Sequence, residues 1–303
     1  MQFRRIKRAI DGVLLLDKPL GLSSNQALQQ VKRLYQAAKA GHTGSLDPLA
    51  TGLLPICLGE ATKFSHFLLD ADKSYRALVQ LGSTTSTGDV EGEVLSRSEV
   101  NVSPAQLQAV LKSFVGGIEQ VPPMYSALKH QGKALYEYAR DGVEIARPAR
   151  QVTIFSIELT GFDQEQHRFE INVACSKGTY IRTLAEDIGH ALGCGAHLAG
   201  LRRLSTAHFR LEDACSMEQL EKMSAEERDS ILLPADASIV DLPRVELDAD
   251  SAYYLLQGQS VWKSGTKIDG FFRIYHENGQ FLGLGELDRD GKIAPKRLLV
   301  ART

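Results

Sequence analysis

The sequence predicts an α+β fold in which a large domain, built on a sheet with helices, precedes a small β module. Three observations support this prediction. Strand-like alternation and helix-like periodicity interchange through residues 12–210, without an internal repeat. From about Pro243 the pattern changes to short strands with hairpin turns at residues 278–279 and 290–291. A chain of 303 residues is long enough for about two domains.

The N-terminal elements follow from local signals. Residues 12–17 predict a short buried strand, and a serine cap at residue 23 or 24 predicts a helix through about residue 38. Residues 41–55 are too rich in glycine and proline for a helix or strand, and too apolar for a solvated linker. Residues 59–70 predict a helix whose apolar stripe leaves Lys63 outside it, which is typical of a surface residue.

The middle of the chain alternates strands and helices. We expect strands at residues 74–81, 152–160, 169–175 and 197–210, and helices that begin at Ser103-Pro104 and after residue 179. Tyr75 lies on the apolar face of its strand, which favours a core position. Arg182 lies off the apolar stripe of its helix with Glu186 one turn later, the pattern of a surface ion pair.

Composition sets limits on function. The formal charge of −2 and the pI near 6.5 do not indicate a nucleic-acid binder, so any RNA site must be a local patch. The four cysteines have no CxxC spacing, which predicts neither a zinc site nor a disulfide framework. The basic start, with Arg4 and Arg5, precedes an apolar run too short for a signal peptide, and no stretch is long enough for a membrane span. We therefore expect a soluble, unprocessed cytoplasmic protein.

Residues 41–55 leave two interpretations of Asp47 open. Its carboxylate could cap a short helix with Pro48 at the first helical position. Alternatively, the glycines could let the backbone approach a ligand while the rigid Asp-Pro step holds the carboxylate towards it. The two interpretations are compatible.

Residues 121–150 form a second unusual segment, because basic residues are interleaved with tyrosines, although acidic residues weaken this signal. On the residues alone, three functions compete. A metal site would need more ligands than His42 and Asp47, and a paired-carboxylate glycosidase would need a second acid that cannot be located. An RNA-binding protein would need only the basic segments and the β module.

Five ordered segments resemble the TruB family of tRNA pseudouridine synthases. They are GHTGSLDPLATGLLPICLGEATKF from residue 41, GVLLLDKPLGLSSNQALQQVKRL from residue 12, PPMYSALKHQGKALYEYAR from residue 122, CSKGTYIRTLAEDIGHALG from residue 175 and HLAGLRRL from residue 197. The resemblance covers most of residues 10–210, and chance agreement at five ordered places is not plausible.

The resemblance implies roles for individual residues. Asp47 would be the nucleophile and Arg182 its partner, which would hold the carboxylate ionised. Tyr75 would stack on a flipped-out base, Tyr180 and Leu201 would line the uridine pocket, and Lys63 would lie near the site. His42 would fill the gap that the flipped base leaves, with acid or base catalysis as the rival role.

The resemblance also implies a substrate and an architecture. It predicts that the uridine at position 55 in the T arm of tRNA is isomerised to pseudouridine, without a cofactor, metal or guide RNA. Nothing in the sequence argues against a monomer, which is the state we expect. The resemblance implies a pseudouridine synthase fold with a mixed, largely antiparallel sheet at residues 1–240, an RNA-binding insertion at about 92–150, and a PUA-like β barrel at residues 243–303. The change of sequence pattern places the linker at about 233–243. The alternative is an RNA-binding folding factor in which Asp47 is only a helix cap.

Overall fold

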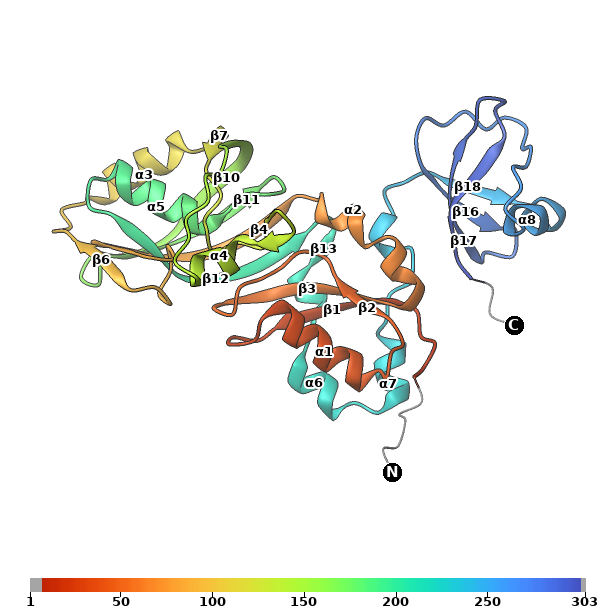
Figure 1. Cartoon of the computed structure of the whole chain (residues 1–303), viewed down its shortest axis with the longest axis horizontal. Coiled ribbons are helices and arrows are strands. Elements are labelled where there is room, and N and C mark those ends of the chain that lie inside the picture. Colours follow the sequence, from red (N-terminus) through yellow and green to blue (C-terminus); the bar gives the residue numbers. More distant parts are fainter. Residues whose placement is uncertain (1–6, 301–303) are drawn as a thin grey trace.

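The computed structural model describes residues 7–300, which form a ten-stranded sheet followed by a separate four-stranded sheet (Figure 1). Arg4 and Arg5 of the basic start lie outside the described residues. None of the helices within residues 7–300 is long and apolar enough to cross a lipid bilayer.

The large sheet is mixed and largely antiparallel, as expected. Its strand order is β14-β1-β3-β12-β4-β11-β10-β7, with β2 beside β3 and β13 beside β12. Only the β1–β14 and β3–β12 neighbours are parallel among the pairs of this sheet that the structure describes. The strands are β1 Gly12–Lys18, β2 Ala40–His42, β3 Ala50–Leu58, β4 Lys73–Leu81, β7 Gly116–Gln120, β10 Arg150–Asp163, β11 Arg168–Cys175, β12 Ala196–Thr206, β13 Phe209–Arg210 and β14 Cys215–Ser216.

Helices cover this sheet and supply the other half of its core. In Figure 1, α3 and α5 lie over the half of the sheet that contains β10, whereas α1 and α6 lie beside β1 and β3. The helices are α1 Ser24–Leu34, α2 Ser65–Leu69, α3 Pro104–Ser113, α4 Leu135–Arg140, α5 Ile181–Ala191, α6 Met217–Lys222 and α7 Ala225–Ser230, with 3-10 turns η1 Gly59–Lys63 and η2 Leu211–Asp213. Two short hairpins complete the domain, β5 Ser83–Thr85 with β6 Val94–Arg97, and β8 Lys129–His130 with β9 Lys133–Ala134.

Several predictions from local signals are confirmed. Ser23 and Ser103 both close capping boxes at the starts of α1 and α3. In β4, Tyr75, Ala77, Val79 and Leu81 are buried while alternate residues are more exposed. Cys175 is a core residue on β11, next to the buried stripe of α5.

The prediction that residues 41–55 avoid regular structure is wrong, because β2 and most of β3 lie in this segment. β3 is buried on both faces, so its apolar run shows no alternation. Pro55 is tolerated because it falls between Gly52, where pairing with β12 ends, and Ile56, where pairing with β2 begins. The helix expected at residues 59–70 divides into η1 and α2, and α1 ends at Leu34 rather than near residue 38.

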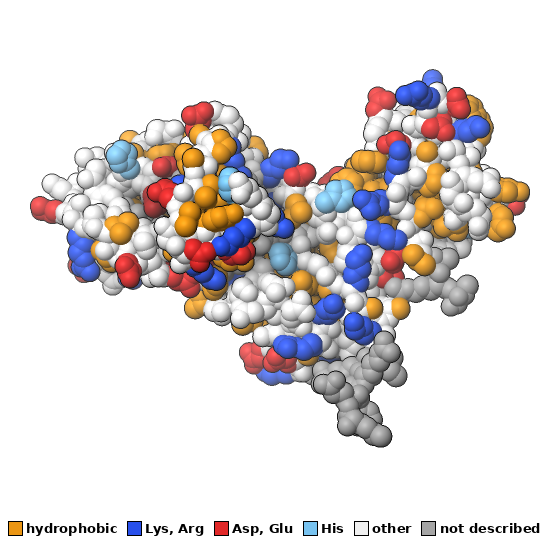
Figure 2. Space-filling view, in the orientation of Figure 1, with side chains coloured by type: hydrophobic (Ala, Val, Ile, Leu, Met, Phe, Trp, Pro, Cys, Tyr) orange, Lys and Arg blue, Asp and Glu red, His pale blue; other side chains and the backbone are white. Residues whose placement is uncertain are grey.

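The C-terminal module is the small β structure predicted from about residue 243. It contains β15 Arg244–Leu247, α8 Ala249–Leu256, β16 Phe272–His276, β17 Phe281–Leu287 and β18 Ile293–Leu298 around its own core. The segment before it carries η3 Ala237–Ile239. Figure 2 shows Lys and Arg side chains gathered on the middle of one face, below α2 and towards the C-terminal module.

Candidate active site

A cavity of about 550 Å³ opens where the two halves of the large sheet meet. It is lined by the turn before β3, by β4 and β12, by the start of α5 and by residues 126–128. Five of the seven residues singled out from the sequence line it: Asp47, Tyr75, Tyr180, Arg182 and Leu201. Segments far apart in the chain therefore converge on one carboxylate.

Asp47 lies in a tight turn rather than at a helix N-terminus. The Ala50 amide donates to the Asp47 carbonyl at 3.0 Å, and β3 begins at Ala50. Ser24 of α1 bonds to both backbone groups of Leu46, and Pro48 accepts from the Gly21 amide. The interpretation of Asp47 as a helix cap is wrong, because its turn leads into a strand.

Arg182 lies in the first turn of α5, with a side chain only 6% exposed. Its Nη2 lies 3.1 Å from Asp47 Oδ2 and its Nη1 lies 3.5 Å from Asp89 Oδ2. The guanidinium also donates to the carbonyls of Thr87 and Tyr125. The surface pair expected from spacing with Glu186 is therefore replaced by a buried network, in which fixed acceptors hold the guanidinium in place.

The start of α5 is anchored from the sheet. Tyr180 provides no side-chain cap, but its amide donates to Gln120 Oε1 at 3.0 Å and its carbonyl accepts from Gln120 Nε2 at 3.2 Å. Gln120 ends β7 and is 1% exposed. A strand end thus fixes the helix turn that carries Arg182.

The electrostatics of Asp47 result from opposing effects. Removal from water raises the pKa of the Asp47 carboxyl, the Arg182 charge lowers it, Asp89 raises it and Lys18 lowers it, and the net direction is upward. The side chain is still 46% exposed towards the cavity. Asp47 therefore combines a paired carboxylate with access to a ligand.

Three family models match the chain in order. Residues 32–181 match the TruB family pseudouridylate synthase N-terminal domain, residues 182–240 match the tRNA pseudouridylate synthase B C-terminal domain, and residues 243–299 match the pseudouridine synthase II TruB C-terminal domain. A protein from Methylobacillus flagellatus named tRNA pseudouridine synthase B is 72% identical over 99% of this chain and 98% of its own length. The chain belongs to the TruB family of pseudouridylate synthases. This family relation makes it an isomerase.

Further relatives support the family assignment and the fold. A tRNA pseudouridine synthase B from Yersinia enterocolitica is 54% identical over 98% of this chain and 93% of its own length. Among solved structures, a chain of a Cbf5-Nop10-Gar1 complex superposes with a TM-score of 0.71 at 26% identity, covering 95% of this chain and 84% of that one. The predicted pseudouridine synthase fold is therefore confirmed.

Further residues complete the cavity wall around the Asp47 carboxylate. Tyr75 is 8% exposed on β4, and Leu201 of β12 lies opposite Ala77 of β4. The guanidinium of Arg150 lies 4.9 Å from the centre of the Tyr180 ring. The cavity that holds the carboxylate is thus lined by two tyrosines, Tyr75 and Tyr180.

His42 and Lys63 do not line the cavity. His42 pairs with Ile56 on β3, and its buried Nδ1 has no hydrogen-bond partner among the described residues. Burial and the Arg203 charge lower the pKa of the His42 imidazole, which favours the neutral ring. Lys63 follows the end of β3 that is remote from Asp47. There its Nζ donates to Glu60 and to the carbonyl of Leu298 in the C-terminal module. The expectation that Lys63 lies near the site is therefore wrong, because β3 separates Lys63 from Asp47.

Several charged residues of the site were not predicted. Arg203 is 1% exposed and donates to the carbonyls of Leu53 and Gly44, which flank the Asp47 turn. Gly52 lies against it, because a Cβ there would be 2.3 Å from the Arg203 carbonyl oxygen. Burial lowers the pKa of both Lys18 and Lys73 to about 8. The adjacent arginines at 202 and 203 are a basic pair in the sequence, but the sequence does not reveal that Arg203 is buried.

The described residues contain no group of three or more His, Cys, Asp or Glu side chains arranged to hold a metal ion. Cys57, Cys175 and Cys194 are buried free thiols.

Proposed function

We propose that the chain converts the uridine at position 55 in the T arm of tRNA to pseudouridine, with Asp47 as the nucleophile on a flipped-out base. The observation that carries this proposal is the ion pair between Asp47 and the buried Arg182 in a cavity with aromatic walls. The tRNA substrate is supported by the names of relatives that match this chain over nearly its full length. The ion pair leaves the Asp47 carboxylate accessible to a uracil base in the cavity.

The reaction needs an ionised carboxylate, which Asp47 supplies. It needs no second reactant from outside the chain. Asp47 attacks either carbon 6 of the uracil ring or the anomeric carbon of the ribose, and the bond between the base nitrogen and the sugar breaks. The detached uracil turns over and rejoins through carbon 5, and the bond to Asp47 breaks and releases the carboxylate. Carbon 5 loses its proton while the freed ring nitrogen gains one. Substrate and product are isomers, so no redox partner or group donor is required.

Arg182 and the residues around it have defined roles in this scheme. The Arg182 charge lowers the pKa of the Asp47 carboxyl against the effect of burial and so favours the ionised form. Tyr75 stacks on the flipped uracil, while Tyr180 and Leu201 complete the pocket. His42 fills the gap in the RNA stack as a neutral ring, in keeping with its lowered pKa.

RNA binding is distributed over local patches, because the net charge of the chain is −2. Residues 1–240 form the catalytic domain, in which the insertion at about 92–150 contacts RNA, and residues 243–303 form a PUA-like RNA-binding domain. Basic side chains gathered on one face towards the C-terminal module support this division (Figure 2). The chain acts as a monomer in the cytoplasm, without a guide RNA.

The test uses an unmodified tRNA transcript and a matched transcript with cytidine at position 55. Pseudouridine should form at position 55 of the first and nowhere in the second. Two variants then examine the pocket: Tyr75→Phe retains the stacking ring and should keep turnover, whereas Tyr75→Leu should lose it by about 100-fold. Product at another position, or none with the wild-type chain, would contradict the proposal.

A further inference from the structure

A polar bridge joins the catalytic domain to the C-terminal module. Lys63 Nζ lies 2.6 Å from Glu60 Oε2 and donates to the Leu298 carbonyl, at the end of β18, at 2.7 Å. Glu60 Oε2 also accepts from the Val300 amide at 2.8 Å. The side chains of Lys63 and Glu60 are 23% and 17% exposed, so water competes for these bonds less than at an open surface.

An aromatic cluster lies directly beside this bridge. Phe64, the residue after Lys63, is fully buried and meets the Phe281 ring of β17 edge-on, with 5.5 Å between ring centres. Ile239 and Leu284 are buried in the same cluster. Edge-on aromatic contacts restrict the relative orientation of the parts that they join.

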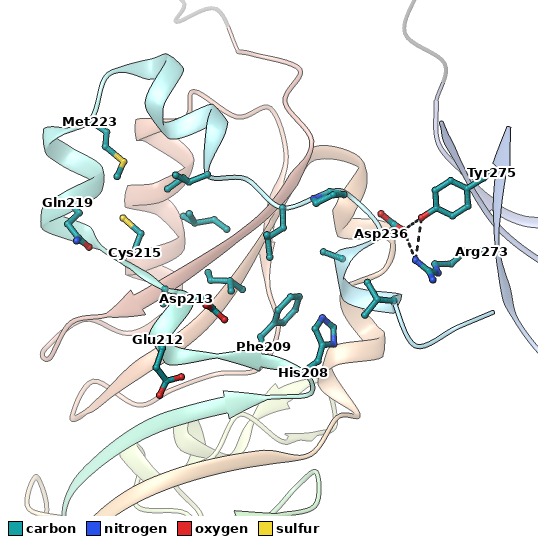
Figure 3. Close-up of a pocket in the computed structure, with 18 residues that line it drawn as sticks. His208, Phe209, Glu212, Asp213, Cys215, Gln219, Met223, Asp236, Arg273 and Tyr275 are labelled. Atoms are coloured by element: carbon teal, nitrogen blue, oxygen red, sulfur yellow. Dashed lines mark hydrogen bonds and ion pairs between the residues drawn. The ribbon is translucent and has the colours of Figure 1, made fainter. Parts of the chain in front are cut away.

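A second anchor lies beside the linker that leads into the module. Figure 3 shows Asp236 directed towards Arg273 and Tyr275 of β16, next to a cavity of about 810 Å³. Arg273 Nη1 lies 3.0 Å from Asp236 Oδ2, and the Tyr275 hydroxyl donates to the same oxygen. The Asp236 and Arg273 side chains are 8% and 16% exposed. The module is thus held through the linker as well as through η1.

The bridge at Lys63 is remote from the chemistry. Asp47 precedes the start of β3 by three residues, and η1 follows its end. A strand of nine residues spans roughly 26 Å, so Lys63 does not reach a base held at Asp47. Any effect of Lys63 on the reaction must pass through the placement of the module.

We propose that Lys63 and Glu60 are positioning residues that fix the C-terminal module relative to Asp47, so that RNA beyond the T arm is held at a set distance from the cavity. This inference rests on the proposed function, because it assigns RNA contacts to the module. A T-arm stem-loop needs only the cavity and its surroundings, whereas a complete tRNA reaches both parts. The bridge therefore acts on the binding of complete tRNA and not on the chemical step.

The test compares three full-length variants with the wild-type chain. Lys63→Met removes the bridging ammonium, and Val300→Pro removes one amide donor at an exposed residue without a change of charge. Lys222→Met is the matched control, because it also removes one lysine charge, from a Lys–Glu pair on the surface of α6. Hydrogen exchange at β18 and Val300 reports the bridge independently of activity.

For Lys63→Met we expect faster exchange at Val300 and about a fivefold higher KM for complete tRNA, with kcat unchanged and KM for the T-arm stem-loop within about twofold. Val300→Pro, which has no amide hydrogen at this position, should speed exchange in β18 and raise KM for complete tRNA. Lys222→Met should change neither exchange nor KM. An equal rise of KM on both RNAs, or unchanged exchange in Lys63→Met, would overturn the inference. Absence of product with wild-type protein would instead contradict the proposed function, while the exchange data would still decide whether the bridge exists.

Discussion

Arg182 Nη2 lies 3.1 Å from Asp47 Oδ2, and the same buried guanidinium is held from behind by Asp89 and two backbone carbonyls. The arginine is therefore fixed before any ligand binds, while the carboxylate that it faces is 46% exposed to the cavity. Preorganised charge of this kind stabilises an ionic group without rearrangement during the reaction.

Arg182→Lys should lower kcat by about 100-fold, because a single ammonium cannot replace a planar group that bonds two carboxylates and two carbonyls. Single-turnover kinetics on the T-arm stem-loop measures the change. Arg168→Lys, at an exposed position on β11, is the control and should leave kcat unaltered. Equal rates in the two variants would mean that the Arg182 network is only structural.

The pH dependence of kcat/KM should have an acid limb set by Asp47. Burial raises the pKa of this carboxyl in spite of Arg182, and only the ionised form attacks, so activity should be lost on acidification at a higher pH than for a free aspartate. Replacing Arg182 with Gln removes the effect that lowers the pKa and should move the limb to still higher pH. A limb that stays in place in Arg182→Gln would assign it to another group.

Glu186→Gln should stabilise the protein more at pH 8 than at pH 5. Burial first, and then the neighbouring Asp187 charge, raise the pKa of Glu186 from 4.5 to about 7, so the folded state favours the protonated side chain. The stability from that proton is present below about pH 4.5 and is lost as the pH rises towards 7. Thermal unfolding at both pH values measures the difference in Tm between variant and wild type. Equal shifts at the two pH values would contradict the assignment.

His42→Phe should retain turnover within about threefold, because the lowered pKa of His42 and its unbonded Nδ1 are suited to a neutral stacking ring rather than to proton transfer. His42→Ala should raise KM for the stem-loop, since it leaves the gap in the RNA unfilled. Steady-state kinetics of both variants makes the distinction. Loss of kcat in His42→Phe by orders of magnitude would point to acid or base catalysis.

Local sequence patterns predicted the elements that expose one face. The alternation in β4 and the periodic stripe of α5 each gave the correct buried side, because each element packs against a single layer. The same logic failed for β3, which is buried on both faces. It contains Pro55 at a position that pairs with neither β12 nor β2, so the missing N–H of the proline is tolerated.

The candidate site could be predicted from its resemblance to a family, but not from local chemistry. Arg182 lies off the apolar stripe of α5, and nothing in that pattern reveals that Asp47 and Asp89 lie opposite it. Arg203 was likewise visible only as part of a basic pair, although it clamps both sides of the Asp47 turn. Long-range pairing brings these side chains together, and local periodicity does not record it. Lys63 illustrates the converse, since the resemblance implied a position near the site, whereas β3 separates Lys63 from Asp47.

The most direct test of the central claim is pseudouridine formation in an unmodified T-arm stem-loop by the wild-type chain and by Asp47→Asn, with RNA affinity measured for both. Asparagine keeps the size and much of the hydrogen bonding of the side chain but cannot act as a carboxylate nucleophile. We predict that turnover falls by at least about four orders of magnitude while affinity stays similar. Product formation by Asp47→Asn at a rate near that of the wild type would show that this carboxylate is not the nucleophile.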